Sequence, residues 1–142
     1  MKIAIGEDHA GFEVKQQVIE YLKGLQIDVV DKGAYSLDSV DYPEFGHAVG
    51  KAVSTNEVDR GIVICGSGIG ISIATNKIKG IRAALCTSIE HAEMCRKHND
   101  ANVLAVGAQM TELNMIYKMI SVWLETEFEG GRHQLRVNKI DL

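Results

Sequence analysis

Short apolar runs rich in β-branched residues alternate along the chain with longer segments whose apolar side chains recur every three or four positions. The runs predict buried strands, and the longer segments predict helices with one buried face. Strands are expected over residues 2–6, 27–31, 61–65, 81–86 and 102–106. Helices are expected across residues 14–25, 45–53, 90–97 and 111–125, with another that opens after the glycine-rich turn at 66–70.

This regular alternation is typical of parallel strands joined by right-handed crossovers. We therefore predict an α/β fold, a doubly wound, Rossmann-like three-layer sandwich around a five-stranded parallel sheet. A chain of 142 residues is about the size of one domain, so a single domain over residues 1–142 is expected. Ligands of such folds bind beyond the carboxyl ends of the strands, which brings together residues 8–9, 65–70 and 107–109.

The strand at 61–65 runs into a turn with glycine at every second position. Gly66, Gly68 and Gly70 let the backbone N–H groups point at one spot, which favours an anion or a developing oxyanion at a helix N-terminus. Cys65 and Ser67 lie in the same turn, and the positive end of a helix stabilises a thiolate. Cys65 is therefore a candidate base or nucleophile, and a buried cysteine that only fills space is the alternative.

Two better-known phosphate motifs do not fit this turn. A dinucleotide fingerprint needs its third glycine where Ile71 stands and an acidic residue where Cys86 stands. A P-loop needs a closing Gly-Lys-Ser/Thr, which is missing here. A tight turn that only allows close packing of strand and helix remains the other interpretation.

Composition narrows the range of partners. A net charge of −4 offers no basic face for a phosphate backbone, so nucleic acid is not expected as a partner. No apolar run approaches the roughly 18 residues that span a bilayer, and the first residues lead straight into a strand pattern without a signal-peptide core. Three cysteines without the spacing of a disulfide framework fit a reducing compartment. We expect a cytoplasmic protein without membrane contact.

Three further groups are candidates for chemistry, and each has a simpler explanation. Imidazole titrates near neutral pH, which makes His98 a candidate proton donor, although surface or capping histidines are more common. Arg132 and Arg136 lie four apart, so on a helix both guanidinium groups share one face and suit a phosphate; a solvated helix end is the more common case. Asp8 is either a substrate ligand or the cap of the first helix.

A metal site has to be weighed as well, because His91, Cys95 and His98 recur at helical spacing. A strong zinc signature would add a second close pair of ligands, such as Cys-x-x-Cys, and the chain has none. We therefore expect no metal.

Five stretches resemble the ribose-5-phosphate isomerase B family, which also contains the galactose-6-phosphate isomerase subunits. They span nearly the whole chain in the family's order, and the ordered set is highly specific although each stretch is modest singly. The matching stretches are GEDHAG at 6–11, DYP at 41–43, ICGSGIGISIATNK at 64–77, HNDANV at 98–103 and GGRHQLR at 130–136.

The resemblance implies interconversion of an aldose phosphate and a ketose phosphate through an enediolate, without a metal or an organic cofactor. It implies that Cys65 moves the proton between C1 and C2 with help from Ser67, and that His98 opens the sugar ring. The amides of 66–70 match the loop that stabilises the enediolate oxygen, and the two arginines match the phosphate clamp. The positions that match substrate-binding residues are Asp8, His9, Tyr42, Gly66, Gly68, Ile69, Gly70, Asn99, Arg132 and Arg136.

The family's sites are shared between two subunits. The resemblance therefore implies a homodimer, or a tetramer built from two such dimers, and we expect the helical segment 111–142 at the dimer interface. The partner that binds each site is expected to be a small sugar phosphate.

One position departs from the family pattern. Gln109 stands where many members carry an arginine that helps hold the phosphate; glutamine keeps a hydrogen bond and loses the charge. We expect isomerisation of ribose 5-phosphate, with two alternatives: an isomerase of a six-carbon sugar phosphate (allose 6-phosphate or galactose 6-phosphate), or a sugar-phosphate-binding protein without catalysis. Cys65 disfavours the galactose-type A subunit, which lacks a cysteine at the base position.

Overall fold

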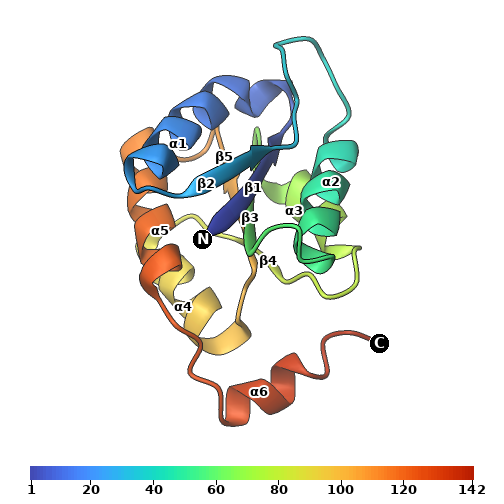
Figure 1. The fold of residues 1–142 in the computed structure, drawn as a ribbon, viewed down its shortest axis with the longest axis vertical. Helices are drawn as coiled ribbons and strands as arrows, with labels where there is room; N and C mark the ends of the chain where they lie inside the picture. Colours follow the sequence, from blue (N-terminus) through green and yellow to red (C-terminus); the bar gives the residue numbers. More distant parts are fainter.

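The computed structural model describes residues 1–142. The strands are β1 (Lys2–Glu7), β2 (Asp28–Asp31), β3 (Arg60–Cys65), β4 (Ala83–Leu85) and β5 (Val103–Gly107). All of them pair in parallel in the order β2-β1-β3-β5-β4. The helices are the 3-10 turn η1 (His9–Gly11), α1 (Phe12–Gly24), α2 (Tyr42–Ser54), α3 (Ile69–Asn76), α4 (Ile89–Asn99), α5 (Leu113–Glu125) and α6 (Arg132–Val137). The predicted α/β fold with a five-stranded parallel sheet is confirmed (Figure 1).

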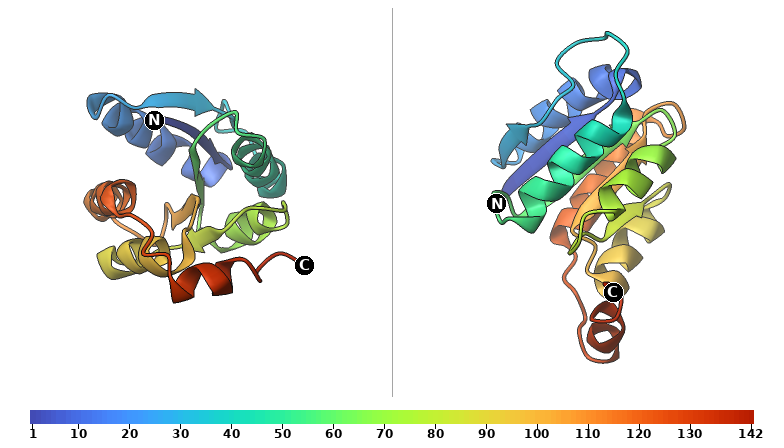
Figure 2. Two further views of the ribbon diagram at one scale, coloured as in Figure 1. Left: turned by 60° about the horizontal axis from the view of Figure 1, so that its bottom comes forward. Right: turned by 90° about the vertical axis from the view of Figure 1, so that its right-hand side faces the viewer.

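Apolar side chains cover both faces of the sheet, which explains why the strand segments are apolar at nearly every position. On one face Ile3 and Ile5 pack with α1, α4 and α5, and on the other face Ala4 packs with α2 and α3 (Figure 2). Trp123 of α5 is fully buried in the first core, where its indole N–H donates to the backbone oxygen of Ala101 at 3.2 Å. The apolar stripe of α5 therefore faces the chain's own core.

β4 is shorter than the strand predicted over 81–86. The N–H of Arg82 donates to the side-chain oxygen of Asn102 at 2.8 Å, and both backbone groups of Ala83 bond to the side chain of Asn76. These amide side chains take the place of strand partners along an edge of the sheet. The side chain of Asn102 thus bonds to the residue before β4, and the side chain of Asn76 satisfies the free edge of β4 at Ala83.

The sheet has a carboxyl end and an amino end, because all strands point the same way. Loop 32–41, between β2 and α2, lies beyond the carboxyl end at the top of Figure 1, and α6 lies at the bottom (Figure 1). On β3, Gly61 pairs with Val103 and Cys65 pairs with Gly107 of β5. With a rise of about 3.3 Å per residue, the two ends are about 13 Å apart along these strands. None of the helices combines the length and the apolarity needed to cross a bilayer.

Candidate active site

Cys65 is the last residue of β3, and the turn that follows it begins α3. The thiol is only 5% exposed, and its sulfur accepts the N–H of Gly68 at 3.1 Å. The hydroxyl oxygen of Ser67 accepts the N–H of Ile69 at 3.2 Å. The next two N–H groups of the first helical turn, those of Gly70 and Ile71, have no acceptor within the chain. The sulfur of Cys65 and these free donors thus belong to one turn at the positive end of a helix.

Two glycines make this turn possible. Gly68 has φ +79°, and a Cβ there would lie 2.8 Å from the backbone carbon of Val106. A Cβ on Gly107, at the end of β5, would lie 2.5 Å from the backbone oxygen of Ser67. The turn therefore packs directly against the end of the neighbouring strand, and any side chain at either position would push Cys65 and Ser67 out of place.

Tyr42, the first residue of α2, supplies one wall next to this turn. A Cβ on Gly70 would lie 2.7 Å from two ring carbons of Tyr42, so the ring lies directly against the glycine. The side chain of Tyr42 remains 39% exposed. Pro43 fixes the start of α2 at this point and so sets where the ring is carried.

Asp8 and His9 follow β1 and lie at the same end of the sheet. The N–H of Asp8 donates to the backbone oxygen of Ile64 at 3.2 Å, which ties the residue to β3. Its carboxylate accepts the N–H of Ala10 at 3.0 Å, so Asp8 caps the η1 turn, as one of the two interpretations of the sequence predicts. The Nδ1 atom of His9 accepts the N–H of Val40 at 3.2 Å, which leaves Nε2 to carry the ring proton.

Gln109 completes the carboxyl end. Its N–H donates to the backbone oxygen of Gly66 at 2.9 Å, and its side-chain oxygen lies 3.0 Å from where a Cβ of Gly66 would be. The neutral amide therefore lies over the glycine turn, at the position where the family resemblance leads one to expect an arginine.

The remaining predicted site residues lie elsewhere. His98 and Asn99 end α4, which runs antiparallel to the strands, so both lie at the amino end of the sheet. Arg132 and Arg136 are exposed on α6, below α4 in Figure 1. One chain therefore brings Asp8, His9, Tyr42 and the turn at 65–70 together, and it holds His98, Asn99 and the arginines at the opposite end.

His98 has close neighbours at the amino end. Its ring stacks on His133 with centroids 4.5 Å apart, and Glu129 places one carboxylate oxygen 3.8 Å from His98 and 3.5 Å from His133. Burial of the ring, followed by the charges of His98 and Arg132, lowers the pKa of His133. The ligand atoms of His98, Glu129 and His133 lie within 4.8 Å of one another, a set that differs from the helical His91, Cys95 and His98 weighed above. The expectation of no metal stays a prediction.

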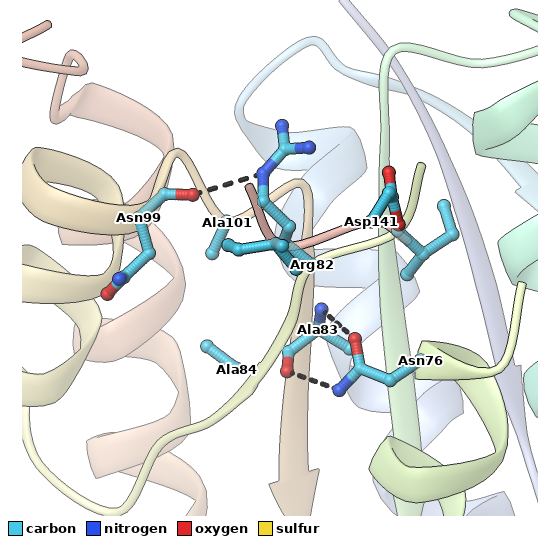
Figure 3. Close-up of a pocket in the computed structure, with 9 residues that line it drawn as sticks. Asn76, Arg82, Ala83, Ala84, Asn99, Ala101 and Asp141 are labelled. Atoms are coloured by element: carbon cyan, nitrogen blue, oxygen red, sulfur yellow. Dashed lines mark hydrogen bonds between the residues drawn. The ribbon is translucent and has the colours of Figure 1, made fainter. Parts of the chain in front are cut away.

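The largest cavity lies at the amino end and not beside Cys65. It has a volume of about 380 Å³, and Arg82, Asn99 and Asp141 lie at its rim (Figure 3). The backbone oxygen of Asn99 accepts the Nε–H of Arg82 at 3.0 Å. This hydrogen bond holds the backbone of Asn99 in the wall of the cavity.

A buried ionic cluster behind Asp8 was not expected from the sequence. Lys15 is fully buried and donates to Asp31 at 3.0 Å and to the backbone oxygen of Ala34, while Glu7 lies 3.1 Å from its Nζ. Apart from this ammonium group, neither carboxylate oxygen of Glu7 has a hydrogen-bond partner. Burial outweighs the attraction of Lys15 and raises the pKa of Glu7 to about 8. The signal in the sequence is a charged residue on the apolar face of α1.

Comparison with known proteins decides the family. The family described as ribose/galactose isomerase matches residues 3–140. The chain belongs to this family. It is 46% identical over 139 residues to ribose-5-phosphate isomerase B of Escherichia coli K12, which covers 98% of this chain and 93% of that protein.

Solved structures of the ribose/galactose isomerase family give the same result. Ribose-5-phosphate isomerase B of Clostridium thermocellum superposes with a TM-score of 0.98 at 51% identity, covering 99% of this chain and 95% of that one. Ribose-5-phosphate isomerase B of Mycoplasma genitalium, solved with bound ribulose 5-phosphate, superposes with a TM-score of 0.94 at 41% identity, covering 98% of this chain and 93% of that one.

Proposed function

We propose that this isomerase interconverts ribose 5-phosphate and ribulose 5-phosphate through an enediolate. The observation that carries the proposal is the thiol of Cys65 beside the free N–H groups of Gly70 and Ile71. Proton removal next to a carbonyl needs a base and preorganised donors for the oxygen that becomes negative. Close similarity to the two ribose-5-phosphate isomerases B supports the same substrate.

In this mechanism the Cys65 thiolate removes the proton from C2 of the open-chain aldose. The electron pair moves to the carbonyl oxygen, which becomes the enediolate oxygen and accepts the N–H groups of Gly70 and Ile71. The hydroxyl oxygen of Ser67 already accepts the N–H of Ile69, so its own hydrogen is free to donate to a substrate oxygen. The Ser67 hydroxyl passes a proton from O2 to O1 as the proton on Cys65 returns to C1, which leaves C2 as the carbonyl of the ketose, and no metal or organic cofactor is needed.

His98 and the two arginines take part only if a second copy of the chain supplies them. We therefore propose a homodimer in which the amino end of one chain faces the carboxyl end of the other. Residues 126–142 contain no buried side chain, and Leu135 and Ile140 are 68% and 50% exposed there. Beside the candidate site, Ile69 and Ile73 are exposed one turn apart on α3. Within the segment 111–142, the tail and not the core-facing stripe of α5 offers free apolar surface.

In the assembled site His98 would donate the proton that opens the sugar ring, with Asn99 beside it. Arg132 and Arg136 lie one helical turn apart on α6 and would hold the phosphate of the substrate. Asp8, His9 and Tyr42 would contact the sugar from the chain that provides Cys65. The three free cysteines fit a reducing compartment, and we propose the cytoplasm.

Gln109 favours a second candidate substrate. A neutral amide over the glycine turn leaves out one charge that would hold a phosphate at this end of the sheet, so a longer, six-carbon sugar phosphate is the alternative. Parallel turnover assays on ribose 5-phosphate, allose 6-phosphate and galactose 6-phosphate distinguish the candidates. We expect the highest kcat/KM with ribose 5-phosphate. A preference for either six-carbon sugar would replace the substrate, and binding of all three without turnover would contradict catalysis.

A further inference from the structure

Cys86 and Cys95 form a thiol pair that the isomerase mechanism does not use. Cys86 follows β4, Cys95 lies on α4, and their sulfur atoms are 3.9 Å apart. Both belong to the core on the α1, α4 and α5 face of the sheet, whereas Cys65 belongs to the core on the opposite face. The sheet therefore separates Cys65 from the pair.

A small molecule can reach this pair from solvent. Both cysteines line a cavity of about 230 Å³, together with His91, Met94 and Asn99. His91 and Asn99 are exposed at the surface, so the cavity leads from solvent to the two sulfur atoms. Cys95 is 7% exposed and Cys86 is 1% exposed, which makes Cys95 the sulfur that a reagent meets first.

The surroundings give the two sulfurs different roles. The thiol of Cys86 donates to the sulfur of Cys95, and this hydrogen bond, with the charges of Arg96 and Arg60, lowers the pKa of Cys95. The same hydrogen bond and burial raise the pKa of Cys86. Both arginines are held by backbone oxygens, Arg96 by that of Ala101 at 2.9 Å and Arg60 by that of Trp123 at 2.8 Å. Cys95, whose S–H otherwise faces the backbone oxygen of Ala92 at 3.3 Å, is thus the sulfur of the pair that loses its proton more readily, and Cys86 is the hydrogen-bond donor to it.

We propose that Cys86 and Cys95 are a dithiol site that hydrogen peroxide oxidises to an intramolecular disulfide. The Cys95 thiolate attacks one peroxide oxygen, the O–O bond breaks, and hydroxide leaves and takes a proton from solvent to form water. The sulfenic acid on Cys95 is then attacked by the Cys86 sulfur. The S–O bond breaks, and the departing hydroxide takes the Cys86 proton as a second water. Two sulfurs lose two electrons together, and the peroxide gains them.

Little movement is needed for this bond to form. A disulfide is about 2.05 Å long, so the sulfurs, now 3.9 Å apart, must approach by roughly 2 Å. Reversible disulfides of this kind in reducing compartments are usually redox-sensing rather than structural.

Mass spectrometry of the oxidised protein tests the proposal without reference to activity. The reduced chain is treated with hydrogen peroxide, free thiols are alkylated, and the protein is digested after lysine and arginine. Cleavage after Arg82 and Arg96 releases residues 83–96 as one peptide with both cysteines. We expect this peptide to be unalkylated and lighter by two hydrogen atoms, and to regain both thiols with dithiothreitol.

Variants test the roles of the two sulfurs. In Cys86→Ala, dimedone should trap a sulfenic acid on Cys95, whereas in Cys95→Ala oxidation of Cys86 should slow by about tenfold or more. Cys65→Ala is the matched control and should form the disulfide at the rate of the unaltered chain. Far-UV circular dichroism checks the fold of each variant. If Cys95→Ala does not fold, Cys95→Ser takes its place. Retention of both thiols in peptide 83–96 while Cys65 is oxidised would overturn the proposal, as would trapping on Cys86 instead of Cys95.

Discussion

The two ends of this sheet carry two different kinds of surface. At the carboxyl end, the atoms offered to a ligand are a buried sulfur and backbone N–H groups, held by a turn that packs against β5 without room for another carbon atom. At the amino end, the polar groups are long or exposed side chains, with both arginines on a six-residue helix that has no buried residue. The carboxyl end is therefore preorganised within one chain, whereas the side chains of the amino end would be held in place only in the proposed dimer.

The largest expected effect comes from mixing two inactive variants. This experiment tests directly whether the two ends of the sheet, from different chains, form one site. Cys65→Ala and His98→Asn should each lose about 1,000-fold in kcat, because each removes a group that transfers a proton in the proposed mechanism. The two variants are mixed in equal amounts, unfolded and refolded together. About half of the resulting dimers then contain one chain of each variant, and each of these mixed dimers keeps one intact site. Activity should therefore return to about a quarter of that of the unaltered protein.

Refolded single variants serve as controls for the mixture. A mixture that stays as inactive as its components would show that each site lies within one chain, and the proposed dimer would be wrong. The assay uses ribose 5-phosphate under reducing conditions, so that Cys86 and Cys95 stay as thiols.

Alanine at two glycines compares the rigidity of the two ends. Gly68 and Gly130 both have positive φ, +79° and +68°, but a Cβ on Gly68 meets backbone at 2.8 Å and a Cβ on Gly130 meets nothing within 4 Å. Gly68→Ala should lower the free energy of unfolding by about 3 kcal/mol, and Gly130→Ala by about 1 kcal/mol. Urea unfolding at one protein concentration measures both, and equal losses would contradict the difference in packing.

Removal of one arginine tests whether the amino end binds the phosphate of the substrate. Arg136→Ala should raise KM for ribose 5-phosphate by roughly 10- to 100-fold, since a charge-assisted hydrogen bond to phosphate is worth about 1.5–3 kcal/mol. Lys139→Ala, on the same exposed tail, is the matched control and should leave KM unchanged. If turnover of unphosphorylated ribose weakens as much as turnover of ribose 5-phosphate, Arg136 does not bind the phosphate.

The smallest effect concerns Glu7, behind the carboxyl end. Its pKa is about 8 in the folded protein and near 4.5 otherwise, so between these pH values the folded chain holds a proton that the unfolded chain has lost. The free energy of unfolding should therefore fall as pH rises through this window, by about 1 kcal/mol between pH 6 and pH 7 from this group alone. Glu7→Gln should remove that slope. Parallel slopes for the variant and the unaltered protein would show that Glu7 is ionised throughout.

The strands, the helices and the carboxyl-end residues could be predicted because their signals are local. The apolar runs mark β1, β3 and β5, and the topological rule for parallel sheets places Asp8, His9 and the turn at 65–70 together. The opposite placement of His98 follows from the direction of α4, but the sequence pattern does not tell which residues of two chains meet. The resemblance to a family with shared sites supplied that expectation.

The ionic cluster and the thiol pair were missed for a different reason. Lys15 lies on an apolar helical face, where a single charge usually reaches solvent along its own stem, and only the fold shows that Glu7 and Asp31 enclose it. Cys86 and Cys95 come together because the chain turns from β4 into α4. Contacts of this type depend on how elements cross and not on the period of the sequence.

The distance between Cys65 and His98 along the sheet also bears on how the enzyme responds to dilution. If the ring-opening acid and the base belong to different copies, specific activity falls when chains separate, and the dissociation constant of the dimer becomes a kinetic parameter. A substrate that touches both copies binds the pair and not the single chain, so by mass action it favours association. Sugar phosphate would then stabilise the dimer that converts it, and progress curves at low protein concentration would begin with a lag.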